Sequence, residues 1–220
     1  MLGNFPRQGE DTLIPLIWLE LAMERWEDEP DGKPIQLGVD VAAYGSDKTV
    51  IAVRYGKRLK ELHVYSQKNT RETCGIVQQI ARENSTIKIC VDEIGIGRGV
   101  VDSLEEYGYE EVGVNVAEKS SDSERWHNLR AELWCNLREL LDPDKDAIAL
   151  PPDDELLAEL ASVKYKIDAR GAIQIESKDD MRKRLGHSPD RADAVVLSFA
   201  NTEQEGFAES FGKLYVTEFF

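Results

Sequence analysis

Four aspartates, at three places along the chain, have the residue type and spacing to do chemistry. Asp40 lies inside an alternating apolar and polar run, Asp92 ends a short apolar run, and Asp190 and Asp193 open a late helical segment. Residues three apart on a helix share a face, so the last two can point to one place. Carboxylates gathered without histidine or cysteine need hard cations such as Mg²⁺ or Mn²⁺. The pattern predicts a phosphoryl-transfer site with two ions about 3.5–4 Å apart.

Each aspartate also has an ordinary explanation. Asp40 could be an acid at a sheet edge, although an unpaired carboxylate within a strand is costly to bury. Asp190 and Asp193 could complement the positive end of a helix dipole without taking part in any reaction. That explanation does not cover the strand-interior and strand-terminal acids, and the occurrence of all three features favours one shared site.

Residues 36–66 must position Asp40. They alternate apolar and polar side chains and are broken by glycine-containing turns at residues 43–47 and 55–57, which predicts a three-stranded antiparallel meander. Alternate residues of a strand point to opposite faces. The apolar residues opposite Asp40 in the first strand are Leu37, Val39 and Val41.

Asp92 is expected to end a strand over residues 87–92. A glycine-rich turn at residues 93–99 follows, and then a helix to about Tyr107. This order forms half of a β-α-β unit, with the acid at the carboxyl end of the strand, where α/β sheets place their sites. Residues 112–116 would supply the next strand, so the fold class is α/β.

The remaining elements follow from helical periodicity, caps and turns. Thr70 is expected to cap one helix, and Ser188 to cap the last helix with Pro189 as its first residue. Residues 165–167 and 173–175 predict a hairpin, and residues 147–150 a short strand. The expected helices cover residues 14–26, 70–84, 123–141, 153–163, 179–185 and 188–200.

Composition limits the function further. The 220 residues carry a net charge of −15, which argues against binding nucleic acid or anionic membranes through the whole surface. Residues 160–191 are locally basic, with eight lysines and arginines against five acids. The three cysteines are odd in number and lack a Cys-x-x-Cys pair, which predicts free thiols in a reducing compartment. No signal peptide or apolar run long enough to span a bilayer is present.

The order of these motifs resembles the ribonuclease H-like nuclease fold. Its central mixed β-sheet would combine the antiparallel meander with parallel strands and be flanked by helices. The segment PDRADAVVLSFA is similar to the final helix of Holliday-junction resolvases and of phage large terminase nucleases. Three more segments, GVDVAAYGSDKT, VDEIGIGRGVVDSL and LGNFPRQGEDTLIP, resemble the large terminase subunit of tailed bacteriophages. The resemblance runs from about Leu2 to Ala200.

The resemblance implies a Mg²⁺- or Mn²⁺-dependent endonuclease that cuts concatemeric double-stranded DNA with two divalent cations and little sequence specificity. Its catalytic residues and metal ligands would be Asp40, Asp92 and one or both of Asp190 and Asp193. Asp47 resembles an additional acid near the terminase site, although an aspartate also has an ordinary role in such a turn. His187 lies where some relatives use histidine, and a structural role in a loop is the alternative.

Complete large terminases also carry an ATPase, but no G-x-x-x-x-G-K-[ST] motif occurs here. Residues 1–34 are therefore expected to be a linker and helix that follow an absent ATPase domain, residues 35–202 the nuclease domain, and residues 203–220 a tail. The implied partners are the ATPase domain, the small terminase subunit, the portal and DNA, without a membrane. The implied location is the cytoplasm of the bacterial host.

The DNA contacts are expected to be with phosphates, because cleavage that ends packaging need not read sequence and no recognition helix or zinc finger is evident. An alternative set lies on the meander, at Lys57, Arg58 and Lys60. The primary candidates are Lys164, Lys166, Arg170, Arg182, Lys183 and Arg184.

Three other functions fit parts of the pattern. Actin-like and sugar-kinase ATPases or phosphotransferases also open with a hairpin, an aspartate and a turn, but their second phosphate turn and adenosine loop are poor or missing here. A junction-resolvase-like nuclease would share the acids. A catalytically inactive binding module would be expected to lose acids, whereas this chain retains four.

Overall fold

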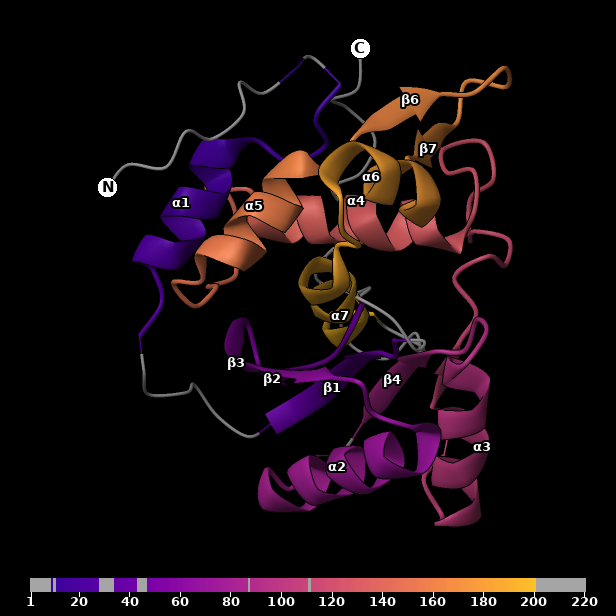
Figure 1. Ribbon diagram of the computed structural model, residues 1–220. Helices are drawn as coiled ribbons and strands as arrows, with labels where there is room; N and C mark the ends of the chain where they lie inside the picture. The colour runs from indigo at the N-terminus through magenta and orange to yellow at the C-terminus, as the bar shows by residue number, and fades with distance from the viewer. Residues whose placement is uncertain are drawn as a thin grey trace.

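The computed structural model describes Gly9 and residues 11–27, 34–42, 47–86, 88–110 and 112–200. The sheet has five strands in the order β3-β2-β1-β4-β5, and β6 and β7 form a separate hairpin (Figure 1). In chain order the elements are α1 (Leu16–Glu24), β1 (Pro34–Asp40), β2 (Lys48–Tyr55), β3 (Arg58–Ser66), α2 (Thr70–Glu83), β4 (Ile89–Asp92), α3 (Gly97–Glu106), β5 (Gly113–Val114), α4 (Leu129–Leu141), α5 (Asp154–Ser162), β6 (Tyr165–Ile167), β7 (Ile173–Ile175), α6 (Lys178–Leu185) and α7 (Asp190–Ser198).

The sheet is mixed, as the sequence predicts. β1 is antiparallel to β2, and β2 to β3, which confirms the meander. β4 is parallel to β1, and β5 is parallel to β4. One detail of the prediction is wrong: Asp40 is the last residue of β1 rather than an interior one. The chain leaves the sheet there, and the amide of Ala42 donates to the hydroxyl of Thr49 at 3.1 Å.

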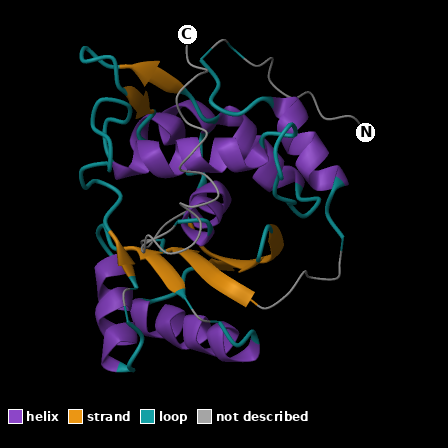
Figure 2. Ribbon diagram, turned by 180° about the vertical axis from the view of Figure 1, so that it is seen from behind, coloured by secondary structure: helices purple, strands orange, loops and turns teal. Residues whose placement is uncertain are grey.

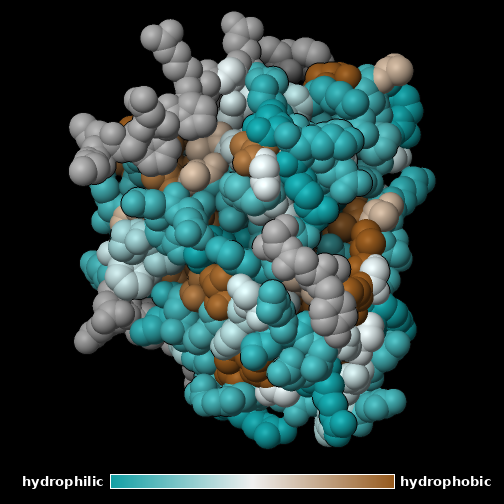
Figure 3. Space-filling model, viewed as in Figure 1, coloured by the Kyte–Doolittle hydropathy of each residue, from teal (hydrophilic) through white to brown (hydrophobic). Residues whose placement is uncertain are grey.

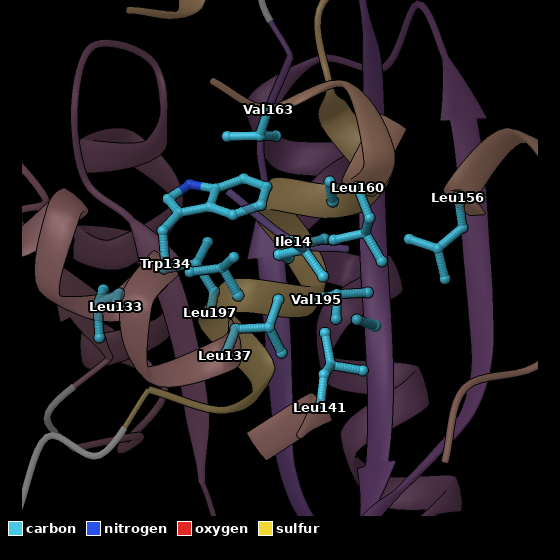
Figure 4. Close-up of a cluster of buried hydrophobic side chains, with 14 of the residues drawn as sticks. Ile14, Leu133, Trp134, Leu137, Leu141, Leu156, Leu160, Val163, Val195 and Leu197 are labelled. Atoms are coloured by element: carbon cyan, nitrogen blue, oxygen red, sulfur yellow. The ribbon is translucent and has the colours of Figure 1, made fainter. Parts of the chain in front are cut away.

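Two helical layers enclose the sheet (Figures 1 and 2). Helices α2 and α3 cover one face, over a core that includes Leu37, Val39 and Ile51. Helix α7 lies on the other face, and α4, α5 and α1 lie beyond it (Figure 1). Their shared core contains Trp134, Leu160 and other apolar side chains (Figure 4). β1 therefore turns its apolar residues toward α2 and α3, and its other face toward α7.

Several element ends differ from the predicted ones because local capping outweighs periodicity. α4 begins at Leu129, not at residue 123, because the side chain of Asn128 caps it by accepting from the amide of Ala131. Asn69, not Thr70, caps α2 in a capping box with Glu72.

The last helix and two short strands also differ. α7 begins after Pro189, so Ser188 lies before the cap position and does not fill it. β5 is limited to two residues. Residues 147–150 do not form the predicted strand; Ala149 makes an isolated parallel bridge with Arg58.

The segment before the sheet packs into the same body as α4 and α5. The amide of Leu13 donates to the carbonyl of Val163 at 2.9 Å, and that of Leu150 to Ala22 at 3.0 Å. The domain division at residue 34 stays a prediction, and residues 203–220 lie outside the described residues. All three cysteines are buried free thiols, as predicted. Within the described ranges, no helix has the length and apolar character needed to cross a membrane.

Gly38 is where α7 rests directly on β1. A Cβ atom at this position would lie 2.1 Å from the carbonyl oxygen of Ala194 and 2.2 Å from the amide nitrogen of Ser198. Both are backbone atoms, which cannot rotate away as a side chain can. We expect Gly38→Ala to lower the free energy of unfolding by about 2–3 kcal/mol, measured by denaturant unfolding.

Gly75 provides the matched control. It lies within α2, and a Cβ atom there would meet nothing within 4 Å. Alanine is a better helix former than glycine, so Gly75→Ala should raise stability by up to about 1 kcal/mol. Equal effects of the two substitutions would contradict the close contact between β1 and α7.

Candidate active site

The predicted aspartates meet at the carboxyl edge of the sheet. Val39 of β1 is in register with Val91 of β4, so the next residue on each strand, Asp40 and Asp92, lies at the same edge. Helix α7 packs on β1 and β4 and carries Asp193 in its first turn. Residues far apart in the sequence are thus brought to one place by three elements.

A lysine that the sequence did not single out lies between two of these acids. The ammonium of Lys178, the first residue of α6, is 2.9 Å from Oδ1 of Asp40 and 3.0 Å from Oδ2 of Asp193. The other oxygen of Asp193 faces a guanidinium nitrogen of Arg130 at 3.4 Å. Arg130 lies in the first turn of α4. The acid cluster therefore has two built-in cations.

The remaining acids are held by the backbone or by a surface cation. Oδ2 of Asp190 accepts from the amide of Lys48 at 2.7 Å. Oδ1 of Asp92 accepts from the amide of Ile94 at 3.0 Å. Asp47 pairs with Arg182, and its charge is close enough to raise the pKa of Asp190. All five predicted acids therefore belong to the same neighbourhood.

Burial makes these carboxylates electrostatically unequal. Asp40, Asp190 and Asp193 are 5%, 8% and 7% exposed. Burial raises the pKa of Asp40 to about 7, against the opposing effect of Lys178. Burial also raises the pKa of Asp92 and of Asp190. It opposes the charge on Asp193 as well, but Arg130 and Lys178 outweigh it and hold the pKa of that carboxyl below its usual value.

The positive charge of Lys178 is stabilised by the acids around it. Burial disfavours its charge, yet Asp193 and Asp40 raise its pKa above the usual value for lysine. The cluster of Asp40, Asp92, Asp190 and Asp193 thus faces two permanent cations, which leaves an excess of negative charge at a largely buried site.

This donor set fits oxygen-preferring divalent cations, since it offers carboxylates without histidine or cysteine. Within the described residues, no three acid, histidine or cysteine side chains already converge as a ready ligand set. Lys178 lies between Asp40 and Asp193, so those two carboxylates now share an ammonium. A small pocket of about 10 Å³, roughly the space of one water, is lined on its polar side by Asp92, Arg130, Lys178 and Asp193.

Helix α7 is fixed to the sheet at its carboxyl end. The side-chain amide of Gln36 donates to the carbonyls of Leu197 at 2.8 Å and Ala200 at 2.7 Å. Arg54 of β2 donates to the carbonyl of Ser198. These buried polar groups were not predicted, although glutamine and arginine in an otherwise apolar strand pair are a sequence signal for such a role.

The amino end of α7 is fixed by α5. Arg191 donates to Asp153 at 3.1 Å and to Glu155 at 2.9 Å. Glu159, which is 6% exposed, accepts from the amide of Ala192 at 2.9 Å. Burial raises the pKa of Glu159 to about 8. Contacts at both ends therefore set the position of Asp190 and Asp193.

Most of the predicted DNA-binding residues form ion pairs within the chain. Lys166 is exposed, and Lys183 has a 78% exposed side chain with a loose 3.6 Å pair. On the alternative surface, Lys57 pairs with Asp146. Nδ1 of His187 lies 3.0 Å from the carbonyl oxygen of Ser188. The pairs among the primary candidates are Lys164 with Asp11, Arg170 with Asp168, Arg182 with Asp47, Lys183 with Asp180, and Arg184 with Glu176.

No family model and no curated protein sequence matches the chain. Solved structures do. The K428A mutant nuclease domain of the large terminase subunit gp2 of bacterial virus Sf6, with manganese and beta-thujaplicinol, matches with a TM-score of 0.74 and 21% identity, over 87% of this chain and all of that one.

Two further neighbours come from other phages. The large terminase nuclease of thermophilic phage G20c, with bound magnesium, matches with a TM-score of 0.63 and 18% identity, over 86% of this chain and 97% of that one. The large terminase nuclease domain of Thermus phage P74-26 matches with a TM-score of 0.56 and 17% identity, over 89% of this chain and 93% of that one. The chain has the ribonuclease H-like fold of these terminase nuclease domains, which confirms the fold expected from its sequence.

Proposed function

We propose that the chain is a divalent-cation-dependent endonuclease of a phage DNA-packaging terminase, which cuts concatemeric double-stranded DNA with little sequence specificity. The observation that carries this proposal is the meeting of Asp40, Asp92 and Asp193 at one edge of the sheet, from two strands and a helix. Asp92 and Asp193 line the small pocket there, and Lys178 joins Asp40 to Asp193. The structural neighbours that hold manganese or magnesium support the same reaction class.

The chain would supply ligands, alignment and charge. Asp40, Asp92 and one or both of Asp190 and Asp193 would hold two cations, Mg²⁺ or Mn²⁺, and Asp47 is a further candidate. When bound, such cations activate water and stabilise the leaving oxygen of a phosphodiester. The strand ends and the fixed helix α7 keep the carboxylates at one edge, so that little reorganisation is needed when DNA arrives.

The DNA would be held through its phosphates. Lys166 and Lys183 are the exposed candidates. The other four candidates would have to exchange their acidic partners for DNA phosphates, or contact both; they are Lys164, Arg170, Arg182 and Arg184. The face seen in Figure 3 is mainly hydrophilic, with small separate hydrophobic patches, which suits a polar partner. The proposal also includes its protein partners, which are the terminase ATPase domain, the small terminase subunit and the portal. The proposed location is the cytoplasm of the bacterial host.

Cleavage of supercoiled plasmid tests the proposal. We expect nicking and linearisation with Mg²⁺ or Mn²⁺, and none in excess chelator, because the donor set consists of carboxylates that need a hard cation. Cleavage that survives the chelator would contradict the metal mechanism.

Two substrates separate the alternatives in the same assay. Hydrolysis of ATP without any action on DNA would favour the actin-like or sugar-kinase-type function. Cleavage confined to four-way junctions, with linear duplex left intact, would favour a junction-resolvase-like nuclease.

A further inference from the structure

Arg130 is a buried cation whose hydrogen-bonding capacity is poorly used. Its side chain is 13% exposed, and its guanidinium faces Oδ1 of Asp193 at 3.4 Å. That is longer than a direct charge-assisted hydrogen bond, about 2.7–2.9 Å. Its Nε and the Nη2 that faces Asp193 are buried and have no hydrogen-bond partner among the described residues. Buried polar groups are usually satisfied, so this exception calls for a physical explanation.

Arg191 shows what a satisfied arginine looks like in the same protein. Its side chain is 14% exposed, nearly the same as that of Arg130. It donates to Asp153 at 3.1 Å and to Glu155 at 2.9 Å. Arg191 thus pairs with two carboxylates, whereas Arg130 shares the single carboxylate of Asp193 with Lys178.

The position of Arg130 points to a ligand. It lines the small pocket together with Asp92, Lys178 and Asp193. The first-turn amides of α4 are already used, since Arg130 donates its own amide to Val116 at 2.9 Å. On this helix turn, the donor left for an incoming group is therefore the side chain of Arg130 and not the backbone.

The charge balance identifies the class of ligand. Divalent cations held by the carboxylates would neutralise part of the charge on Asp193 and leave the guanidinium short of negative charge. A phosphodiester supplies one negative charge and two nonbridging oxygens, which match the planar fork of a guanidinium. An arginine beside a cluster of metal-binding acids thus has the donor geometry for a DNA phosphate.

We propose that Arg130 binds a nonbridging oxygen of the scissile phosphate and stabilises the charge that develops on it, which makes it a catalytic residue of the proposed nuclease. In hydrolysis a water oxygen bonds to phosphorus while one ester oxygen leaves; the water loses a proton to solvent, and the leaving oxygen gains one from solvent. Arg130 gives up no proton and acts only through charge and hydrogen bonds. The inference rests on the proposed function.

Plasmid cleavage in Mn²⁺ tests the proposal with three variants. Arg130→Ala should lower kcat by about 10²–10³-fold, as the loss of a transition-state donor does. Added guanidinium should raise the kcat of this variant at least about tenfold, because it can occupy the vacated space. Arg130→Lys keeps a charge beside Asp193, should stay folded, and should still lose about tenfold because it lacks the fork. Arg138→Ala is the control on the same helix, since Arg138 pairs with Glu139 at 3.1 Å.

A binding assay that does not depend on cleavage keeps this inference separate from the nuclease proposal. Anisotropy of a fluorescein-labelled duplex in Ca²⁺, an oxygen-preferring divalent cation, should show weaker binding by Arg130→Ala, about threefold to tenfold, and little change for Arg138→Ala. If the wild-type protein fails to cleave, the proposed function falls and this comparison alone decides whether Arg130 binds phosphate. If the wild type cleaves, a folded Arg130→Ala variant that cleaves within about threefold of it, or that guanidinium cannot rescue, overturns the role of Arg130.

Discussion

Asp40→Asn is expected to abolish DNA cleavage while the domain stays folded. Asp40 ends β1 at the site edge and shares Lys178 with Asp193. An amide cannot supply the charge that a hard cation needs, and a loss of several kcal/mol of transition-state stabilisation corresponds to about 10³-fold or more in rate. The measurement is the rate of plasmid nicking in Mn²⁺, with thermal unfolding of each variant followed in parallel.

In chelator, the stability of the Asp40→Asn variant should equal or exceed that of the wild type, because Lys178 keeps Asp193 as its partner at 3.0 Å. Burial raises the pKa of Asp40 to about 7, above the value of about 3.9 for a free aspartate. The folded state therefore binds this proton more tightly than the unfolded state, and the wild type loses stability as the pH rises from about 4 to about 7. Asp40→Asn removes that loss, so its advantage should be larger at pH 8 than at pH 4.

The matched control for Asp40 is an exposed aspartate away from the cluster. Asp146 has an 86% exposed side chain and pairs with Lys57. Asp146→Asn should leave both the rate of cleavage and the pH dependence of stability unchanged. Normal cleavage by the Asp40→Asn variant would place the active site elsewhere.

Lys178→Ala should weaken the metal-free protein and strengthen divalent-cation binding. Removing the ammonium leaves Asp40 and Asp193 without the cation that they share. Loss of one partner from a fully buried charge pair costs about 3–5 kcal/mol; the side chain of Lys178 is 31% exposed, so the loss of stability should be smaller than that. The same change clears the point between the two carboxylates, so Mn²⁺ should bind at least about tenfold more tightly and raise the melting temperature more than it does in the wild type.

Lys183→Ala is the control for Lys178→Ala. Lys183 lies on the same helix, but its side chain is 78% exposed and its ion pair with Asp180 is a loose one of 3.6 Å. Its replacement should change stability by less than about 1 kcal/mol and leave Mn²⁺ affinity unchanged. Similar Mn²⁺ affinities in the wild type and the Lys178→Ala variant would show that the ammonium does not compete with the cation.

The sequence was informative where a local pattern decides the structure. Strict alternation and glycine turns predicted the meander, and the apolar run that ends in Asp92 predicted β4. The spacing of Asp190 and Asp193 placed both in the first turn of α7. The end of β1 at Asp40 was missed, because the alternation continues past the point where backbone pairing stops.

Lys178 and Arg130 could not be derived from local patterns, since only the tertiary fold brings them to the acids. Lys178 meets Asp40 across 138 positions of sequence. One signal was present nevertheless. Both cations lie in the first turn of a helix, where the helix dipole disfavours positive charge. A basic residue in that position indicates an acidic partner from another element, which is what the fold supplies.

The predicted helix over residues 123–141 failed at its start for a related reason. Trp126 fits the apolar periodicity, but it pairs with Ile173 of the hairpin, and the next amide, from His127, donates to the carbonyl of Ile173 at 2.9 Å. A tertiary contact and the Asn128 cap thus override helical spacing.

Anomalous diffraction from crystals soaked in Mn²⁺ tests the central claim most directly. The carboxylates of Asp40, Asp92 and Asp190 or Asp193 are predicted to bind the metal, so two anomalous peaks should appear within coordination distance of their oxygens. The ammonium of Lys178 should then lie away from the position between Asp40 and Asp193 that it holds in the present structure. Mn²⁺-dependent DNA cleavage by a protein whose anomalous peaks lie only outside this cluster would contradict the account.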